Sequence, residues 1–366
     1  MNNNQPKPGT PVNELDTPAL LVDMNAVDSN YRAVAKTYHN SFCKMRQHTK
    51  NIKSPFLAQR QIDMGGTVGG ICTAKLSEAE EMVKEGIRDI IIANQIVGPD
   101  KITRLCNLEK IAEIKVCVDN PQNVLNLSKI ATSSGVEIGV LIEVDTSSNR
   151  AGVRSPDEGV KLAKLINELT GIRLDGVMSH QHLAEYVDHE HRIITGKKYI
   201  QICLDVKAAI EAEGIPVNYV SSGETFSYDA AAQMTGVNDA QGGSYALMCT
   251  RSSYMKEFTI ANKVLGTVIS TPKPGIAIGD IGSLAFSLPL GIMPEVEDMV
   301  EVKVEKITEY HTILKTTNGF TLNVGDKFKL LPYYQDLMIN RWDQFVAIRD
   351  EIVDMVLEIP GRGCYH

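Results

Sequence analysis

Several features that mark common protein classes are missing from this chain of 366 residues. No run of five or more basic residues occurs and the formal net charge is −8. Nucleic acid is therefore not an expected partner, because phosphate binding needs clustered Lys and Arg. No stretch reaches about 18 consecutive apolar residues, so we expect no membrane-spanning helix. The polar residues 1–12 lack the apolar segment of a signal peptide, and we expect a disordered lead-in there.

Paired cysteines are missing as well. The chain has seven Cys residues, but they form no Cys-x-x-Cys pair and have no regular spacing. Cys43, Cys72 and Cys117 lie inside apolar, strand-like runs, where a buried free thiol is the ordinary role. The pattern is typical of a reduced protein, and we therefore expect a cytoplasmic location.

Short β-rich runs alternate regularly with helical patterns through residues 26–255. Several runs are continuously apolar, such as 89–93 and 139–142, which is typical of parallel strands covered on both faces. Eight strand–helix units in succession favour a TIM-type (β/α)8 barrel. An open doubly wound sheet is the alternative, but no Gly-x-Gly-x-x-Gly follows the first strand of the series. We expect the barrel strands near residues 41–46, 67–73, 89–95, 113–118, 137–145, 174–180, 216–222 and 243–248.

The pattern changes after about residue 255. Alternating apolar and polar residues predict strands, and turns that contain Pro or Gly separate them at 272–275 and 318–319. A mostly antiparallel β domain is therefore expected over residues 256–366. The strand-like segment near residue 20 stands apart from the barrel series, and we assign residues 13–25 to the same β domain.

A lysine stands where a barrel enzyme would place its chemistry, since such enzymes work at the carboxyl ends of their strands. Lys50 follows the first expected barrel strand. Surface charge is one interpretation of this position. The other is a Schiff-base lysine, which must be held in a partly desolvated pocket to be nucleophilic near neutral pH.

Further candidates follow later strands. Arg150 comes after the fifth strand, where it either pairs with Asp145 or contacts a cofactor. Two glycine-containing segments, 221–228 and 242–245, lie at the last two strands, where barrels often hold a phosphate group. A lysine, an arginine and a phosphate cradle at one barrel mouth suggest pyridoxal 5'-phosphate (PLP).

The order of these motifs resembles one family, the D-threonine aldolases and D-serine dehydratases among the fold-type III PLP enzymes. Arg46, His48, Lys50 and Lys53 match that family's Arg-Pro-His-x-Lys-Thr-His-Lys motif. The resemblance implies a PLP barrel followed by a β domain, a homodimer, and a small amino acid as the substrate. The segments that are similar to the family's further motifs are 93–98, 143–153, 220–228 and 242–245.

The resemblance also implies roles for individual residues. Lys50 would carry the cofactor and act in catalysis, and Arg150 would contact the cofactor. His180 stands where the family has a Tyr beside the cofactor. Glu224 stands where the family has Gly, and its carboxylate either faces away from the phosphate or shapes the substrate side. The implied phosphate and cofactor contacts are Ser222, Gly223, Thr225, Tyr228, Gly243, Ser244 and Tyr245.

The metal pair of that family is altered in this chain. Tyr334 replaces the family's histidine, and only Asp336 remains. Imidazole and carboxylate suit divalent metals, whereas neutral Tyr is a poor ligand. Either no metal binds, or Asp336 holds Mg²⁺ or Mn²⁺, since hard oxygen ligands suit hard ions. Without the metal histidine, we expect His180 or His182 to serve as the acid or base.

Together these observations predict a PLP-dependent aldolase that cleaves a D-β-hydroxy-α-amino acid, such as D-threonine, to glycine and an aldehyde. Asp336 in place of the family's Cys favours cleavage over dehydration. The alternatives are a D-serine or 3-hydroxyaspartate dehydratase (an ammonia-lyase), an amino-acid racemase, and a non-catalytic PLP-binding protein. Lys50, Arg150 and the C-terminal β domain argue against the non-catalytic protein.

Overall fold

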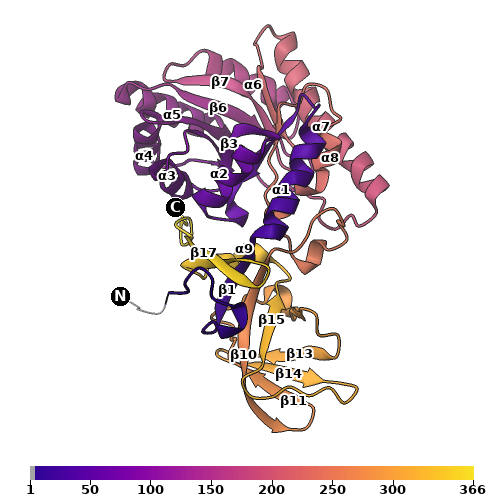
Figure 1. The fold of residues 1–366 in the computed structure, drawn as a ribbon. Coiled ribbons are helices and arrows are strands. Elements are labelled where there is room, and N and C mark those ends of the chain that lie inside the picture. The colour runs from indigo at the N-terminus through magenta and orange to yellow at the C-terminus, as the bar shows by residue number, and fades with distance from the viewer. Residues whose placement is uncertain (1–4) are drawn as a thin grey trace. The chain divides into compact units, whose positions relative to one another are not determined.

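The computed structural model describes residues 5–366 (Figure 1). The chain divides into two compact units. The barrel unit comprises residues 34–50, 57–243 and 364–366, and the sheet unit comprises residues up to 33, 51–56 and 244–363. Among the described residues, no helix has both the length and the apolar character needed to cross a membrane.

The barrel unit contains a closed barrel of eight strands. Every strand pair in it is parallel, and the ring closes because Lys44 on the first strand pairs with Asp239 on the last. The predicted TIM-type barrel is therefore confirmed. The strands are β2 (Lys44–His48), β3 (Thr67–Thr73), β4 (Asp89–Gln95), β5 (Glu113–Val118), β6 (Ile138–Glu143), β7 (Ile172–Ser179), β8 (Tyr219–Ser222) and β9 (Asp239–Ala240).

Helices follow the barrel strands along the chain and surround them (Figure 1). Two of them begin at the caps that their sequences favour. Asn120 accepts backbone N–H groups from Gln122 and Asn123, and Ser155 accepts the N–H of Glu158. The helices are α2 (Pro55–Met64), α3 (Leu76–Lys84), α4 (Pro99–Glu109), α5 (Pro121–Ser134), α6 (Pro156–Asn167), α7 (His189–Ala212) and α8 (Tyr228–Ala231).

The last barrel strand does not lie where the sequence pattern placed it. The strand expected near residues 243–248 is wrong, because β9 ends at Ala240 and the segment Ser244–Ala246 forms a 3-10 turn. Residues 245–248 are apolar because they are fully buried in the sheet unit. Burial of a short apolar run does not by itself distinguish a strand from another buried segment.

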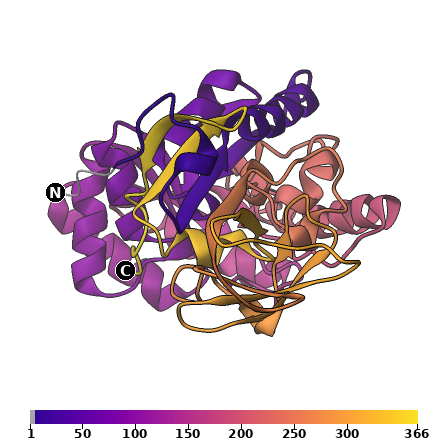
Figure 2. The ribbon, with the colours of Figure 1, turned by 60° about the horizontal axis from the view of Figure 1, so that its bottom comes forward.

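The sheet unit holds a nine-stranded sheet whose main path runs β13-β14-β11-β10-β1-β16-β17. All of its strand pairs are antiparallel except β1 with β16, so the predicted mostly antiparallel domain is confirmed. In Figure 2 the indigo N-terminal strand lies beside the yellow C-terminal strands. The strands are β1 (Ala19–Asp23), β10 (Asn262–Lys273), β11 (Ile276–Gly279), β12 (Glu295–Val296), β13 (Val302–Ile307), β14 (Thr312–Thr316), β15 (Lys327–Leu331), β16 (Gln344–Arg349) and β17 (Ile352–Glu358).

Helix α1 (Met24–Tyr38) follows β1, and its residues up to 33 belong to the sheet unit. The short α9 (Gln335–Ile339) follows β15 in the same unit. The N-terminal segment is also held here. Residues 1–4 of the expected disordered lead-in lie outside the described part of the chain. Later in the lead-in the backbone is held, because Gly9 donates its N–H to the Val353 carbonyl at 2.8 Å and Val12 donates to the Glu351 carbonyl at 2.9 Å. This pairing lets Val12 join the apolar core of the sheet unit.

Candidate active site

A pocket opens in the barrel unit at the carboxyl ends of the barrel strands. Its lining combines an amine, a guanidinium, imidazoles and amides, a mixture that suits a small polar ligand. The structure brings Lys50, Arg150 and His180 together in this pocket. The lining residues are His48, Lys50, Ala74, Ala93, Asn94, Gln95, Glu143, Arg150, Ala151, Met178, His180 and Gln241.

The backbone around Lys50 is held on both sides. Strand β2 continues directly into a 3-10 turn, Thr49–Asn51. The N–H of Lys50 donates to His48 Nδ1 at 3.3 Å, and the hydroxyl of Thr49 donates to the carbonyl of Cys72 at 3.2 Å. These bonds fix the origin of the half-buried Lys50 side chain, so the amine enters the pocket from a rigid strand end.

Arg150 has Glu143 as its carboxylate neighbour, with 3.6 Å between Arg150 Nη2 and Glu143 Oε1. The alternative pairing with Asp145 is not the one observed, because Asp145 instead pairs with Arg154. Glu143 is buried and also accepts the amide N–H of Gln95 at 2.6 Å. Burial raises the pKa of Glu143, and the hydrogen bonds from Gln95 and Arg150 oppose that rise. The side chain of Arg150 is 57% exposed and lines the pocket, so it is accessible to a ligand there.

His180 lines the pocket, but His182 does not belong to the described lining. Burial, together with the nearby positive charges of Lys50 and Arg150, lowers the pKa of His180 to about 3. The ring is therefore neutral near pH 7 and can donate or accept a hydrogen bond. The side chain of His182 is exposed, and its backbone N–H donates to Ser147 Oγ at 3.0 Å. Of the two acid/base candidates, the geometry favours His180.

The loop after β8 is tightly folded. Gly223 has a φ of +129°, and a Cβ at this position would lie 2.8 Å from the Cβ of Ala240. Thr225 Oγ1 accepts the N–H of Gly243 at 3.2 Å, which ties this loop to the one after β9. The side chain of Ser222 is turned inward, where its Oγ lies 2.7 Å from Ser179 Oγ. Any phosphate contact of Ser222 would therefore use its backbone.

The alternatives left open for Glu224 are resolved by its contacts. Its carboxylate is buried and accepts the N–H of Leu183 at 3.1 Å, and its own N–H donates to Ser227 Oγ at 3.0 Å. Glu224 thus holds the loop together and caps the turn that leads into α8. Tyr228, at the start of α8, is buried and accepts the hydroxyl of Tyr38 on its backbone carbonyl at 2.8 Å.

Ser244 and Tyr245 belong to the sheet unit. Ser244 Oγ accepts the side-chain N–H of Asn51 at 3.3 Å. The ring of Tyr245 is fully buried, edge-on to Tyr31 at 6.2 Å between centroids and tilted against Phe258 at 5.8 Å. The Tyr245 side chain therefore packs in an apolar cluster, and a phosphate contact there would again use the backbone.

The altered metal pair also lies in the sheet unit. Tyr334 donates its hydroxyl to Asp336 Oδ2 at 3.3 Å, and Asn51 donates its side-chain N–H to Asp336 Oδ1. Burial and the neighbouring Asp336 charge raise the pKa of Tyr334, so its hydroxyl keeps its proton at neutral pH. The guanidinium of Arg251 lies 5.9 Å from the ring centroid of Tyr334. This environment presents one carboxylate, engaged on both oxygens, beside a cation.

A divalent metal does not fit that set of groups. Stable sites combine three or more imidazole, thiolate or carboxylate ligands, or many oxygens around a hard ion. Within residues 5–366, no group of three or more His, Cys, Asp and Glu side chains could hold a metal. The alternative in which Asp336 holds a metal therefore gains no support from its surroundings.

Some functional candidates were missed from the sequence. Gln241 lines the pocket, and a buried ion pair between Arg46 and Asp239 lies inside the barrel. Asp239 was missed because its strand has only two residues and shows no alternation. Polar residues directly before Gly242-Gly243, at the end of the last strand, were the available signal for Gln241.

The barrel, the antiparallel sheet and the lysine pocket together define a fold-type III barrel enzyme, and comparisons with known proteins agree. The family described as the alanine racemase N-terminal domain matches residues 22–244, and a putative serine dehydratase domain matches residues 261–348. A 3-hydroxy-D-aspartate aldolase of Paracoccus denitrificans is 31% identical over 97% of this chain and 94% of that protein. A D-threonine aldolase of Arthrobacter sp is 30% identical over 98% of this chain and 95% of that protein.

A solved structure agrees with these matches. The crystal structure of D-threonine aldolase from Filomicrobium marinum has a TM-score of 0.93 and 28% identity to this chain, covering 98% of this chain and 99% of that one. The chain belongs to this PLP-dependent family of lyases, in which an alanine racemase-like barrel is joined to a serine dehydratase-like domain. The family resemblance inferred from the motifs is thereby confirmed.

Proposed function

We propose that this protein is a PLP-dependent aldolase that cleaves a D-β-hydroxy-α-amino acid to glycine and an aldehyde. The observation that carries the proposal is the single pocket that Lys50, Arg150 and His180 share at the carboxyl ends of the barrel strands. The aldolases among the chain's relatives support the reaction class.

The pocket's chemistry fits PLP. Lys50 supplies the amine that would attach the cofactor, and Arg150 and the amides of the lining supply hydrogen-bond donors for its ring substituents. The tight loop at Gly223 and the neighbouring Gly243 would hold the phosphate with backbone N–H groups. When bound, PLP withdraws electrons from the substrate's Cα and so stabilises negative charge there.

The residues of this chain would handle the substrate's protons and charges. Cleavage removes the proton of the β-hydroxyl, breaks the Cα–Cβ bond with its electron pair left on Cα, and adds a proton at Cα. His180 is neutral near pH 7 and can accept the hydrogen bond of the β-hydroxyl. Arg150 presents a positive charge that would bind a carboxylate or the cofactor's phenolic oxygen, and Glu143 limits its orientations.

This reaction would proceed without a metal at Tyr334 and Asp336. The ground is the donor set, since both oxygens of the Asp336 carboxylate accept hydrogen bonds and the Tyr334 hydroxyl stays protonated. A divalent ion would have to displace both donors and would gain a single anionic ligand. Activity that persists after exhaustive chelation supports this part of the proposal, and strict dependence on Mg²⁺ or Mn²⁺ contradicts it.

A panel of amino acids tests the reaction class. The purified protein is incubated with PLP and then with D-threonine, D-serine or 3-hydroxy-D-aspartate, and the products are separated. Glycine with an aldehyde supports the aldolase, whereas a keto acid with ammonia identifies a dehydratase and an inverted amino acid identifies a racemase. A PLP absorbance band that responds to none of the amino acids would instead indicate a non-catalytic PLP-binding protein.

The family resemblance further suggests a homodimer, and the scattered cysteines suggest a cytoplasmic location. Sedimentation or light scattering of the PLP-loaded protein measures the assembly directly. A mass of two chains across a range of concentrations supports the dimer, and a mass of one chain contradicts it.

A further inference from the structure

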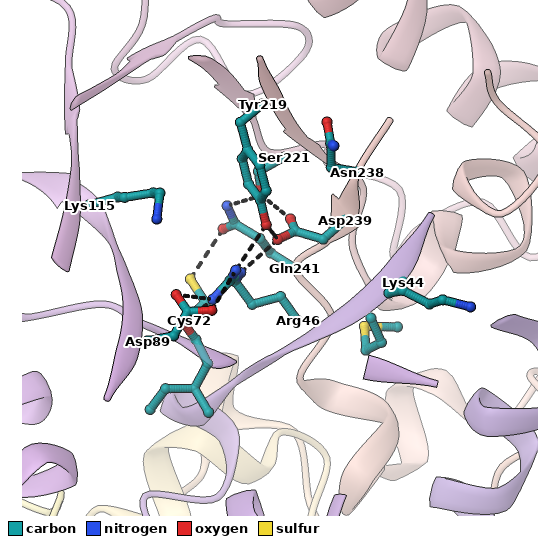
Figure 3. A network of polar contacts seen from close by, with 12 residues as sticks. Lys44, Arg46, Cys72, Asp89, Lys115, Tyr219, Ser221, Asn238, Asp239 and Gln241 are labelled. Atoms are coloured by element: carbon teal, nitrogen blue, oxygen red, sulfur yellow. Dashed lines mark hydrogen bonds and ion pairs between the residues drawn. The ribbon is translucent and has the colours of Figure 1, made fainter. Parts of the chain in front are cut away.

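Gln241 joins the pocket to a buried polar network inside the barrel (Figure 3). It lines the pocket and is 4% exposed. Its side-chain Nε2–H donates to Ser221 Oγ at 2.7 Å, and its Oε1 lies 3.2 Å from Cys72 Sγ. Both ends of the Gln241 amide are therefore held by hydrogen bonds to Ser221 and Cys72.

The network centres on the carboxylate of Asp239, which is completely buried. Its Oδ2 accepts Arg46 Nε–H at 2.6 Å and also the hydroxyl of Tyr219. Its Oδ1 accepts the hydroxyl of Ser221. Because the guanidinium of Arg46 is always charged, this carboxylate is paired, and a paired carboxylate can only accept hydrogen bonds.

The direction of the chain of hydrogen bonds follows from this charge. Ser221 has one hydroxyl proton, which it gives to Asp239, so it can only accept from Gln241. The NH₂ end of the Gln241 amide must therefore face Ser221, and the oxygen end must face Cys72. Burial raises the pKa of the Cys72 thiol, so the thiol keeps its proton and donates it to that oxygen.

We propose that Gln241 contacts the cofactor in the pocket, and that Asp239 and Ser221 are positioning residues that fix which way its amide points. The second N–H of the amide is then a donor of defined direction in the pocket wall. The two ends of an amide have nearly the same shape, so without a fixed charge in the network the side chain could turn over. This inference rests on the proposed binding of PLP in the pocket.

An isosteric change at Asp239 tests the direction. In Asp239→Asn, the amide oxygen can still accept from Arg46 and Tyr219, while the NH₂ replaces Oδ1 and donates to Ser221. The Ser221 hydroxyl then points to Gln241, whose amide turns over. We expect PLP affinity to fall roughly three- to tenfold, the range for one neutral hydrogen bond. Ser221→Ala removes the link and should give a similar loss.

A matched control separates this effect from general destabilisation. Ser128 is another buried serine of the barrel unit and lies on helix α5. Its hydroxyl donates to the Thr170 carbonyl at 2.7 Å. Ser128→Ala should lower the free energy of unfolding about as much as Ser221→Ala but leave PLP affinity unchanged. If Asp239→Asn does not fold, Ser221→Ala against Ser128→Ala carries the comparison. Equal PLP affinities in Ser221→Ala and Ser128→Ala would overturn the proposal.

Reversing the charge arrangement gives a rescue of stability. Gln241→Glu alone presents Ser221 with a second acceptor for its single proton, so the free energy of unfolding should fall. It also removes both N–H donors of the side chain, so PLP affinity should fall as well. In the double variant Asp239→Asn with Gln241→Glu, the new amide donates to Ser221 and Ser221 donates to the new carboxylate. Part of the free energy of unfolding should then return, while PLP affinity stays low. A double variant that is less stable than both single variants contradicts the assigned direction.

The S–H stretching band of Cys72, identified by its loss in Cys72→Ala, reports the amide's orientation without the cofactor. It should show a donating thiol in the wild type and a weaker donor in Asp239→Asn. An unchanged band would overturn the assigned orientation. If the wild type binds no PLP while this band shifts as expected, the proposed function fails and the fixed amide orientation stands.

Discussion

Arg46 and Asp239 form a fully buried ion pair inside the barrel, with 2.6 Å between Arg46 Nε and Asp239 Oδ2. The other side of the guanidinium pairs with Asp89, at 3.0 Å between Nη1 and Oδ1. The three residues come from strands β2, β4 and β9, so the ion network ties together strands that are far apart in the chain.

Breaking this pair should destabilise the protein strongly. Arg46→Met leaves the Asp239 carboxylate buried without its cation, and loss of one partner of a buried pair costs roughly 3–5 kcal/mol. Unfolding in urea measures the change. Arg46→Lys keeps the charge but loses the forked geometry. Its free energy of unfolding should therefore lie between those of the wild type and Arg46→Met. A loss below about 1 kcal/mol in Arg46→Met, the range of an exposed pair, would contradict the buried network.

Glu109 should make stability fall as the pH rises. Burial raises its pKa to about 7 from an unfolded value near 4.5. The folded state therefore holds a proton that the unfolded state has lost, so this contribution is complete below pH 4.5 and disappears as the pH rises through 7. Glu109→Gln stays neutral and can still accept the N–H of Ile114.

The free energy of unfolding of Glu109→Gln, relative to the wild type, should thus increase by about 2 kcal/mol between pH 5 and pH 8. Chemical denaturation at the two pH values measures it. A difference that does not depend on pH would show that Glu109 titrates normally in the folded protein.

His180 should have the opposite dependence. Its pKa in the folded protein is lowered to about 3, whereas an unfolded His titrates near 6.5, so only the unfolded chain takes up a proton between those values. Stability from this group is complete above pH 6.5 and falls as the pH drops. Relative to His180→Asn, the wild type without PLP should lose about 1–2 kcal/mol between pH 7 and pH 5. Equal pH dependence of the two proteins would contradict a neutral His180.

Tyr334→His should give positions 334 and 336 a weak affinity for a divalent metal, because one imidazole and one carboxylate supply two ligands and water can complete the coordination shell. The substitution places an imidazole two residues before Asp336, in a position now held by a protonated phenol. Titration calorimetry with Mn²⁺ should detect binding in Tyr334→His and none in the wild type. Tyr334→Phe is the control, since it removes the hydroxyl without adding a ligand. Equal Mn²⁺ affinity in the wild type and Tyr334→His would mean that Tyr334 does not prevent metal binding.

The sequence allowed the barrel, the antiparallel domain and the pocket's main charged groups to be predicted. Alternating strand and helix patterns locate parallel strands, and a lysine or arginine just past a strand must lie at the barrel mouth. The last strand was misplaced because the apolar residues 245–248 are buried outside the barrel. The actual last strand, β9, has only two residues, which are too few to show a pattern.

The hydrogen-bond network around Gln241 could not be predicted from the sequence, for a different reason. Cys72 lies on β3, Ser221 on β8 and Asp239 on β9, and Gln241 directly follows β9. Only closure of the barrel brings these four residues together. Their roles depend on the direction of the hydrogen bonds, and that direction depends on the charge of Arg46, which lies on β2. The same holds for Glu224, whose partner at Leu183 is distant in the chain.

The most direct test of the account follows the products of D-threonine in the PLP-loaded wild type and in Lys50→Ala. We expect glycine and acetaldehyde in equal amounts from the wild type, with chelator present, and neither product from Lys50→Ala. A keto acid with ammonia from the wild type, or undiminished cleavage by Lys50→Ala, would contradict it.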